Sequence, residues 1–441
     1  MRFAVAGNPV SHSISPKIFY KLFELMNLTG FYSRVAADSF NEVIDVTKIA
    51  GITNLNITSP FKQDAAEASL PHLRDTIVEK LAAANTVIIK EMKAKNKSIS
   101  AFNTDYLGVY ESVKDIFPFK KDKTAFVIGA GGAGIAAAYG LSLAGFSVTV
   151  FNRTVSKAFE KIKWIENCNA AALSDINNNI CSTDIIVNAL PVDDIFFDLS
   201  KAANGTVVFD ANYKNSALTK AATENGLQTI SGLKWLVNQA AASFEIFTGL
   251  KLPDNYINLF AEENLVYDKK NNISLIGFMG SGKTTIGKIV ASLFNTDFID
   301  IDKEIEKKEK MAVADIFKYK NENYFRQIEK RVTETVFNNE KGKVIACGGG
   351  IIKDSENRKT ITSKSFPIWL IAPPEVSIKR ITDNSRPLLN TEKKQEEAVK
   401  LFNERIDFYG ATSSLIIDSS KRSAQDIAKK LYEEINPIFK A

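Results

Sequence analysis

Two glycine-rich segments of different kinds could each hold a phosphate group. Residues 277–284 read Gly-Phe-Met-Gly-Ser-Gly-Lys-Thr and fit the pattern G-x-x-x-x-G-K-[ST] of a nucleoside-triphosphate P-loop. The backbone amides of such a loop surround the phosphates, the lysine reaches the β and γ oxygens, and the hydroxyl binds Mg²⁺. The residues expected to contact the nucleotide are Gly280, Ser281, Gly282, Lys283, Thr284 and Thr285, with Thr284 as the ligand of Mg²⁺.

The second segment fits the pattern G-x-G-x-x-G of a dinucleotide-binding turn. It follows an apolar run at residues 124–128, and an alanine-rich helix is expected after it. Glycines at these places let the backbone approach a pyrophosphate at the positive end of the helix. The residues expected to contact the cofactor are Gly129, Ala130, Gly131, Gly132, Ala133 and Gly134.

The cofactor is expected to be NADP and not NAD. The second strand ends in Asn152, Arg153 and Thr154, at the place where an NAD enzyme usually carries an acidic residue for the ribose 2′-hydroxyl. An arginine there suits a 2′-phosphate, and Lys157 could add a second positive charge. The alternative is that Arg153 and Lys157 are only solvated surface residues.

Two carboxylates close to the P-loop could take part in phosphoryl transfer. Asp300 and Asp302 lie two residues apart at the end of an expected strand, so both should point to one side. One could lie beside the magnesium ion and the other could meet a substrate hydroxyl. Alternatively, they are solvated turn residues.

Strand-like and helix-like segments alternate along the chain, which predicts an α/β fold with mostly parallel sheets. The expected parts are an α/β substrate domain at 1–119, a Rossmann domain at 120–235, helices at about 236–266 that return to the first domain, a linker at 267–272 and a P-loop α/β domain at 273–441. Residues 254–266 are expected to form one of these helices.

Composition narrows the class of protein. Of the 441 residues, 45% are hydrophobic and 24% charged, and the net charge of +5 is spread among interleaved lysines and acids, which argues against a nucleic-acid partner. The three cysteines have no metal-binding spacing. Only two histidines are present, which argues against a zinc site or a Ser-His-Asp triad. With no apolar run of about 18 residues, we expect a cytoplasmic protein without a membrane partner.

Residues 1–266 resemble shikimate dehydrogenase. The matching motifs are Gly7-Asn-Pro9, Ser11-His-Ser13-Ile-Ser15-Pro16, Asn56-Ile-Thr58-Ser-Pro60-Phe-Lys62, Ala84-Asn85-Thr86, Asn103-Thr-Asp105, Gly129–Gly134, Asn152-Arg-Thr154 and Gln239-Ala-Ala241. The resemblance implies that the substrate, a cyclic polyol acid, contacts Ser13, Ser15, Thr58, Asn85, Tyr213 and Gln239, and that Gly232 contacts NADP.

The same resemblance implies that Lys62 and Asp105 are the catalytic pair. Hydride delivery to a ketone produces an alkoxide, which needs a nearby cation or proton donor. The alternatives are that Lys62 is an exposed lysine at a helix start and that Asp105 only caps the helix expected at 106–113. The stretch 190–194 (Leu-Pro-Val-Asp-Asp) departs from the small polar residues usual in the family, so the nicotinamide-side loop is expected to be reshaped.

Residues 273–441 resemble shikimate kinase, with motifs at 324–329 (Tyr-Phe-Arg-Gln-Ile-Glu), 347–350 (Cys-Gly-Gly-Gly), 385–389 (Ser-Arg-Pro-Leu-Leu) and 403–405 (Asn-Glu-Arg). The resemblance implies that the substrate contacts Asp302, Arg326, Gly349, Gly350 and Arg405. It further implies that Asp302 activates the attacked hydroxyl, that Asp300 lies near Mg²⁺, and that Arg386 sits on a lid over the phosphates of ATP. Alternatively, Arg326 only forms a surface ion pair with Glu329. The sequence departs from the family at residues 406–409 (Ile-Asp-Phe-Tyr), where family kinases often carry Pro-Leu-Tyr.

Both resemblances lead to one compound. We therefore predict a bifunctional enzyme of aromatic amino-acid precursor (chorismate) synthesis, which reduces 3-dehydroshikimate to shikimate with NADPH and then phosphorylates shikimate to shikimate 3-phosphate with ATP and Mg²⁺. One alternative is a quinate-preferring dehydrogenase joined to a kinase for another small polyol. The other is a non-catalytic module that senses nucleotide or a pathway acid.

Overall fold

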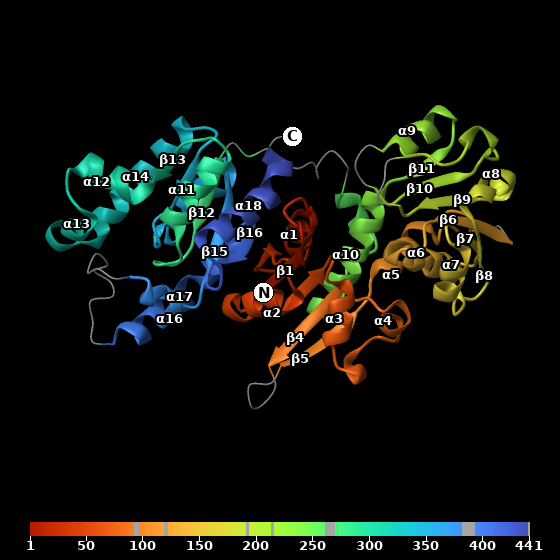
Figure 1. The fold of residues 1–441 in the computed structure, drawn as a ribbon, viewed down its shortest axis with the longest axis horizontal. Helices are drawn as coiled ribbons and strands as arrows, with labels where there is room; N and C mark the ends of the chain where they lie inside the picture. The colour runs from red at the N-terminus through yellow and green to blue at the C-terminus, as the bar shows by residue number, and fades with distance from the viewer. Residues whose placement is uncertain are drawn as a thin grey trace. The chain divides into compact units, whose positions relative to one another are not determined.

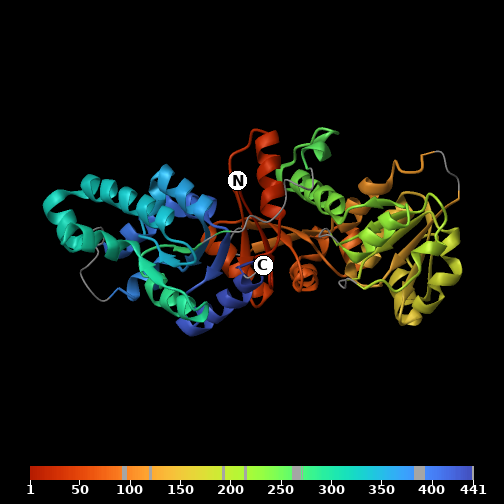
Figure 2. The same cartoon turned by 90° about the horizontal axis from the view of Figure 1, so that it is seen from above.

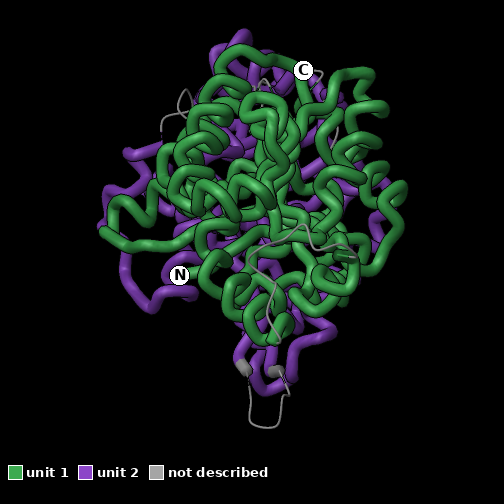
Figure 3. The backbone as a smooth tube through the Cα atoms, turned by 90° about the vertical axis from the view of Figure 1, so that its left-hand side faces the viewer, with its two compact units in different colours: residues 1–61, 267–441 green, residues 62–266 purple. Residues whose placement is uncertain are grey.

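The chain forms two compact units. A computed structural model describes residues 1–91, 97–118, 122–190, 194–212, 216–260, 270, 272–381 and 393–439. Unit 1 comprises residues 1–61 and 267–441, and unit 2 comprises residues 62–266 (Figure 3). Unit 1 thus contains both the start of the chain and all of its C-terminal part. The predicted division at residues 119, 235 and 273 stays a prediction.

Unit 1 is built on a parallel sheet with the strand order β13-β14-β12-β15-β16-β2-β1-β3. Its N-terminal elements are β1 (Arg2–Gly7), α1 (Ser15–Leu25), β2 (Phe31–Ala36), α2 (Phe40–Ala50) and β3 (Asn54–Ile57). Its C-terminal elements are β12 (Asn272–Ile276), α11 (Lys283–Leu293), β13 (Phe298–Asp300), α12 (Ile301–Glu309), α13 (Val313–Lys320), α14 (Glu322–Asn339), β14 (Val344–Ala346), α15 (Ser355–Lys364), β15 (Ser365–Ile371), α16 (Pro374–Lys379), α17 (Lys394–Thr412), β16 (Leu415–Asp418) and α18 (Ala424–Phe439).

The central strands of this sheet are buried over their whole length, as expected where helices cover both faces. Every residue of β12, β15 and β16 is buried. Helix α1 places Ile18, Phe19 and Leu22 in the core. Ser423 caps the start of helix α18, since its hydroxyl accepts a hydrogen bond from the Asp426 amide at 3.2 Å.

Unit 2 contains a second parallel sheet, with the order β11-β10-β9-β6-β7-β8. Its elements are α3 (Lys62–Ala68), α4 (Thr76–Leu81), β4 (Thr86–Glu91), β5 (Lys97–Phe102), α5 (Asp105–Val113), β6 (Lys123–Ile128), α6 (Gly132–Leu143), β7 (Phe146–Asn152), α7 (Val155–Ile162), β8 (Cys168–Ala172), α8 (Ile176–Asn179), β9 (Ile185–Asn188), β10 (Val207–Asp210), α9 (Ala217–Glu224), β11 (Gln228–Ile230) and α10 (Gly232–Thr248). Strands β4 and β5 pair antiparallel. The alternation confirms the predicted α/β class.

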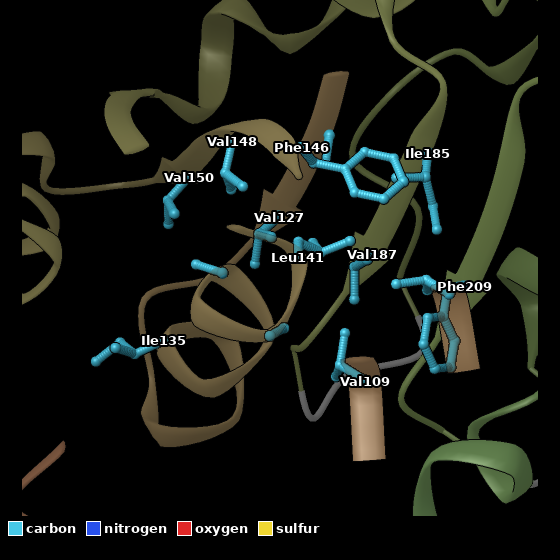
Figure 4. Close-up of a cluster of buried hydrophobic side chains, with 14 of the residues drawn as sticks. Val109, Val127, Ile135, Leu141, Phe146, Val148, Val150, Ile185, Val187 and Phe209 are labelled. Carbon is cyan, nitrogen blue, oxygen red and sulfur yellow. The ribbon is translucent and has the colours of Figure 1, made fainter. Parts of the chain in front are cut away.

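One hydrophobic cluster joins this sheet to the helices that carry the glycine-rich turn. Val127, Val187 and Phe209 from neighbouring strands surround Leu141 of α6 (Figure 4). Helix α6 also packs closely on α5, since a Cβ added at Gly140 would lie 2.5 Å from the Tyr106 carbonyl oxygen. The packing of α6 on the sheet and on α5 therefore holds the turn before α6 in position.

Helix α10 packs on α5, which lies in the part predicted as the first domain. The Trp235 indole donates to the Asp105 carbonyl at 2.8 Å, and the Ser243 hydroxyl lies 2.8 Å from that of Thr86. That residues 236–266 belong to the first predicted domain stays a prediction. The helix predicted at 254–266 is wrong in its described part, where the chain makes only a 3₁₀ turn at Tyr256–Leu259; residues 261–266 lie outside the described ranges.

Among the residues that the structure describes, no helix combines the length and the apolar character that crossing a bilayer requires.

Candidate active sites

Lys62 and Asp105 form an ion pair within unit 2. Lys62 is the first residue of α3, and its Nζ lies 2.6 Å from Asp105 Oδ2. The Asp105 side chain is 8% exposed and that of Lys62 is 32% exposed. The other carboxylate oxygen, Oδ1, accepts a hydrogen bond from the Asn85 amide at 2.8 Å. The structure thus places three of the predicted site residues together.

Asp105 is not a helix cap, so that alternative is wrong. Helix α5 begins at Asp105 with Thr104 in the N-cap position, and the Asp105 amide donates to Asn103 Oδ1 at 3.0 Å. The Asp105 carboxylate faces Lys62 and Asn85 instead, and Asn85 Oδ1 in turn accepts a hydrogen bond from the Thr104 backbone amide at 2.8 Å. A carboxylate held on both sides fixes the position of the lysine ammonium.

Ser13, Ser15 and Thr58 lie in unit 1. The Ser13 and Ser15 hydroxyls are hydrogen-bonded at 3.1 Å, where α1 begins. Thr58 follows β3 and packs against Gly7, since a Cβ added at Gly7 would lie 2.4 Å from Thr58 Cγ2. Glycine at position 7 therefore permits the close approach of these two segments.

Tyr32 is a neighbour of this group that the sequence did not reveal. Its hydroxyl donates to Asn56 Oδ1 at 2.8 Å. Burial raises the pKa of Tyr32 well above its ordinary value, against a smaller lowering by a hydrogen bond with Ser15. The phenol is therefore a neutral hydrogen-bonding group beside Ser15. Gln239 is partly exposed on α10 of unit 2, and the predicted Tyr213 lies outside the described residues.

The glycine-rich turn 129–134 has the geometry that its pattern predicts. Gly129 has φ +99°, and a Cβ added at Gly134 would lie 1.9 Å from the Gly129 carbonyl oxygen. By contrast, a Cβ added at Gly131 or Gly132 would meet nothing within 4 Å. The turn therefore offers open space at the N-terminus of α6, which fits a pyrophosphate.

The surroundings of this turn are also defined. Asn152 ends β7, and its side-chain oxygen accepts a hydrogen bond from the Ala130 amide at 3.4 Å. Thr154 is the N-cap residue of α7. Arg153, Thr154 and Lys157 are exposed. Ala133 lies in the first turn of α6.

Leu190 and Gly232 have different structural roles. Leu190 packs over the turn, because a Cβ added at Gly129 would lie 2.8 Å from Leu190 Cδ2. The rest of the departing stretch, 191–193, lies outside the described residues. Gly232 starts α10, and a Cβ there would lie 2.4 Å from the Ala211 carbonyl oxygen, so packing alone requires this glycine.

The P-loop lies between β12 and α11 of unit 1. Gly277, Gly280 and Gly282 have φ of +148°, +76° and +91°, which side chains rarely adopt. Lys283 Nζ donates to the carbonyl oxygens of Gly277 and Phe278, both at 2.9 Å. A cavity of about 490 Å³ opens beside the loop, and its lining includes Gly280, Gly282, Lys283, Thr284, Thr285, Asp300, Asp302, Gly349 and Arg380. Ser281 is buried beneath it.

Thr284 and Asp300 meet at the edge of this cavity. The Thr284 hydroxyl donates to Asp300 Oδ2 at 2.8 Å. Hard oxygen ligands of this kind suit Mg²⁺. The two acids do not share a strand end as predicted: Asp300 ends β13, and Asp302 is the second residue of α12. Both nevertheless line the cavity, because Asp300 Oδ1 caps α12 at the Asp302 amide.

Arg326 pairs with Glu329, as the alternative interpretation predicted, but Glu329 is buried and not at the surface, and Glu322 is a second, unpredicted partner. Its guanidinium lies 2.7 Å from Glu329 and 3.1 Å from Glu322. It also lies against Gly350, where an added Cβ would come within 2.4 Å of Arg326 Nη2. The carboxylate of Glu329 is almost fully buried, and burial raises its pKa to about 7 although Arg326 lowers it.

Arg405 contacts Gly349, which lines the cavity. It is 2% exposed, and its Nη1 donates to the Gly349 carbonyl oxygen at 3.2 Å. The Tyr409 hydroxyl donates to the same oxygen at 2.6 Å. The sequence analysis assigned no site role to Arg380, which lines the cavity, or to Tyr409, and it included Glu329 only as a motif residue and a partner of Arg326. Arg386 lies outside the described residues.

Comparison with known proteins agrees with this geometry. The family model "Shikimate kinase" matches residues 279–436, "Shikimate dehydrogenase substrate binding domain" matches residues 5–87, and "Shikimate / quinate 5-dehydrogenase" matches residues 111–206. The NADP(+) shikimate dehydrogenase of Methanocella arvoryzae is 30% identical over 275 residues, which cover 60% of this chain and 98% of that protein. The shikimate kinase of Persephonella marina is 41% identical over 165 residues, which cover 37% of this chain and 98% of that protein.

A solved structure also matches the dehydrogenase part. The shikimate dehydrogenase of Thermus thermophilus, in complex with NADP(H) and shikimate, aligns with a TM-score of 0.51 at 27% identity and covers 60% of this chain and 98% of that one. The fold and the two sites thus define a two-enzyme chain, a dinucleotide-fold oxidoreductase followed by a P-loop kinase. The chain belongs to the shikimate dehydrogenase family and, through its C-terminal part, to the shikimate kinase family.

Proposed function

We propose that this chain catalyses two consecutive reactions: NADPH-dependent reduction of 3-dehydroshikimate to shikimate, and ATP- and Mg²⁺-dependent phosphorylation of shikimate to shikimate 3-phosphate. The observation that carries the proposal is the presence, in one chain, of the Lys62–Asp105 ion pair and a P-loop cavity that contains Asp302. The first is suited to protonating an alkoxide and the second to activating a hydroxyl beside a triphosphate.

In the first reaction, NADPH held at the turn 129–134 would supply a hydride to the ketone carbon. The oxygen that becomes negative takes a proton from the Lys62 ammonium, which Asp105 holds in place at 2.6 Å. Ser13, Ser15, Thr58, Asn85, Tyr213 and Gln239 are proposed to bind the substrate hydroxyls and carboxylate. The site needs no metal ion, because the lysine provides both charge and proton.

NADP binding is assigned to the turn at 129–134 and to the residues after β7. Asn152, Arg153, Thr154 and Lys157 are proposed to surround the 2′-phosphate, and the exposure of Arg153 and Lys157 leaves both able to meet it.

Replacing Arg153 with Ala should lower kcat/KM with NADPH about tenfold or more while leaving the rate with NADH nearly unchanged. A wild-type enzyme that prefers NADH would contradict this assignment.

In the second reaction, Mg²⁺ near Thr284 and Asp300 offsets phosphate charge when bound. Lys283 stabilises the transferred phosphoryl group, together with Arg386. Asp302 orients the attacking hydroxyl, while Arg326, Arg405 and the backbone at Gly349 and Gly350 are proposed to hold the substrate carboxylate. Arginine forks suit this role, since they pair with a carboxylate through two hydrogen bonds.

A single assay of the purified chain tests the whole proposal. The chain is incubated with 3-dehydroshikimate, NADPH, ATP and Mg²⁺, and shikimate and shikimate 3-phosphate are followed separately. Both products are expected in sequence. Parallel rates with quinate distinguish the quinate-preferring alternative, and tight ligand binding without any turnover would favour a sensing module.

A further inference from the structure

The end of the kinase part pairs with the start of the dehydrogenase part inside unit 1. Strand β16 runs parallel to β2, with Ile416 opposite Val35 and Ile417 opposite Ala36. In Figures 1 and 2 the blue C-terminal elements around β16 and α18 lie beside the red N-terminal ones. The pairing joins two sheet edges that would each otherwise present unpaired backbone groups. The two enzymes are thus continuous in structure as well as in sequence.

A buried arginine ties this junction to the segment 8–15, which carries Ser13 and Ser15 and is called the substrate loop below. Arg34 on β2 is 6% exposed. Its Nε and Nη2 donate to the Ser13 carbonyl oxygen at 2.9 and 2.5 Å, and its Nη1 donates to the Ser414 carbonyl oxygen at 3.0 Å. One guanidinium therefore links the substrate loop to the residue that precedes β16.

The last helix of the kinase part holds the middle of the same loop. Glu434 of α18 is 1% exposed, and its Oε2 accepts hydrogen bonds from the amides of Val10 at 2.9 Å and Ser11 at 3.0 Å. The Ser11 hydroxyl donates to the Glu434 carbonyl oxygen. Hydrogen bonds to an ionised acceptor are about twice as strong as neutral ones. The carboxylate thus fixes two successive amides of the loop.

One turn earlier on α18, Lys430 fixes the beginning of the loop. Its Nζ lies 2.5 Å from Asn8 Oδ1 and 2.8 Å from Asp38 Oδ1, and its side chain is 7% exposed. These contacts are costly to break, because the nearly buried Lys430 ammonium would then lose its partners. The loop is therefore anchored at Asn8, Val10, Ser11 and Ser13.

We propose that Glu434 and Lys430 are positioning residues for the dehydrogenase, and that the kinase part holds the substrate loop in its binding-competent form. This inference rests on the proposed function, in which Ser13 and Ser15 bind the substrate. Loosening the loop should weaken substrate binding, since its hydroxyls would no longer be preorganised. It should leave the chemical step nearly intact, because Lys62 is held by Asp105 and Asp105 in turn by Asn85, in hydrogen bonds to which the substrate loop does not contribute.

The test compares full-length variants. Glu434→Leu should raise KM for 3-dehydroshikimate about tenfold, well below the hundredfold that a misplacement of about 1 Å costs a reacting group. We expect kcat and the KM for NADPH to stay within about twofold, because the substrate loop holds neither the catalytic pair nor the NADP turn. Glu434→Gln should restore most of the affinity, because an amide oxygen can still accept from Val10 and Ser11. Glu433→Leu, an exposed neighbour on the same helix, is the matched control and should change nothing.

The outcomes separate this inference from the function on which it rests. If Ser15→Ala raises KM but a folded Glu434→Leu does not, the positioning role is wrong while the proposed site stands. If Ser15→Ala leaves KM unchanged, the substrate assignment itself fails. Should Glu434→Leu not fold, Lys430→Met decides: a rise in KM of about threefold, with thermal stability retained, supports positioning, and an unchanged KM overturns it.

Discussion

At the scale of single residues, Lys62 and Lys283 should separate the two activities. Lys62→Ala removes the proposed proton donor, and general acid catalysis typically contributes about 10²–10⁴ in rate. Dehydrogenase kcat/KM should fall by that factor while phosphorylation is unchanged, and Lys283→Ala should do the reverse. Steady-state rates of both reactions on each variant check this. Gln63→Ala, exposed and next to Lys62 on α3, is the control; loss of both activities in a folded Lys62→Ala protein would contradict two separate sites.

Glu329 should titrate near neutral pH. Burial raises its pKa to about 7, and Arg326 opposes the rise. Since the folded pKa lies above the unfolded one, the stability that Glu329 contributes is full below the unfolded pKa and is lost as pH rises through about 7. Carbon-13 NMR of carboxyl-labelled glutamate should show one resonance with a midpoint near 7 that disappears in Glu329→Gln.

The same titration has a second expected result. In Arg326→Met the lowering effect of the guanidinium is gone, so the midpoint of Glu329 should move further up. A midpoint that moves down, or a normal glutamate midpoint in the wild type, would show that the carboxylate is hydrated and not buried as described.

At the scale of elements, the glycine-rich turn contains two kinds of glycine. Gly134 is required by the chain, because an added Cβ would lie 1.9 Å from the Gly129 carbonyl oxygen, whereas Gly131 faces open space. Gly134→Ala should therefore lower thermal stability by an overpacking cost of about 1–3 kcal/mol and weaken NADP binding. Gly131→Ala should fold normally and weaken NADP binding alone. Thermal melts and NADP titrations check both, and equal melting temperatures with equal loss of affinity would refute the distinction.

How much the sequence could predict depended on separation along the chain. The two phosphate-binding turns are local, so eight or fewer consecutive residues were enough to place Lys283, Thr284 and Gly129–Gly134. The contact of Lys62 with Asp105 spans 43 residues and was predicted only through family resemblance. Local rules also misled: Asp105 fits a cap pattern but bonds Lys62, and Asp302 fits a strand pattern but lies in α12.

The pairing of β16 with β2 had no signal in the sequence. Both strands are short and fully buried, and periodicity does not tell an edge strand from a central one. Arg34 and Glu434 read as ordinary charged residues of a strand and a helix. Their burial and their partners, such as Ser414 and Val10, become visible only in the folded chain.

At the scale of the whole molecule, the shared sheet of unit 1 should make the two activities fail together on heating. Gly410 of α17 lies against Phe31 of β2, and an added Cβ would come within 2.3 Å of the phenyl ring. Gly410→Val should therefore disturb residues 1–61 from a position in the kinase sequence, at an overpacking cost of about 1–3 kcal/mol. We expect it to lower the temperature at which half of each activity survives, for dehydrogenation as well as for phosphorylation.

Activity midpoints are the appropriate measurement, because a chain of this size need not unfold in one two-state step. Ala411→Val is the matched control: it places the same β-branched side chain on the same helix, but at an exposed position. It should shift neither midpoint by more than the small helix-propensity cost, well under about 1 kcal/mol. If Gly410→Val lowered only the phosphorylation midpoint, residues 1–61 would fold independently of the kinase part, and the junction between β16 and β2 would be a contact without energetic consequence for the dehydrogenase.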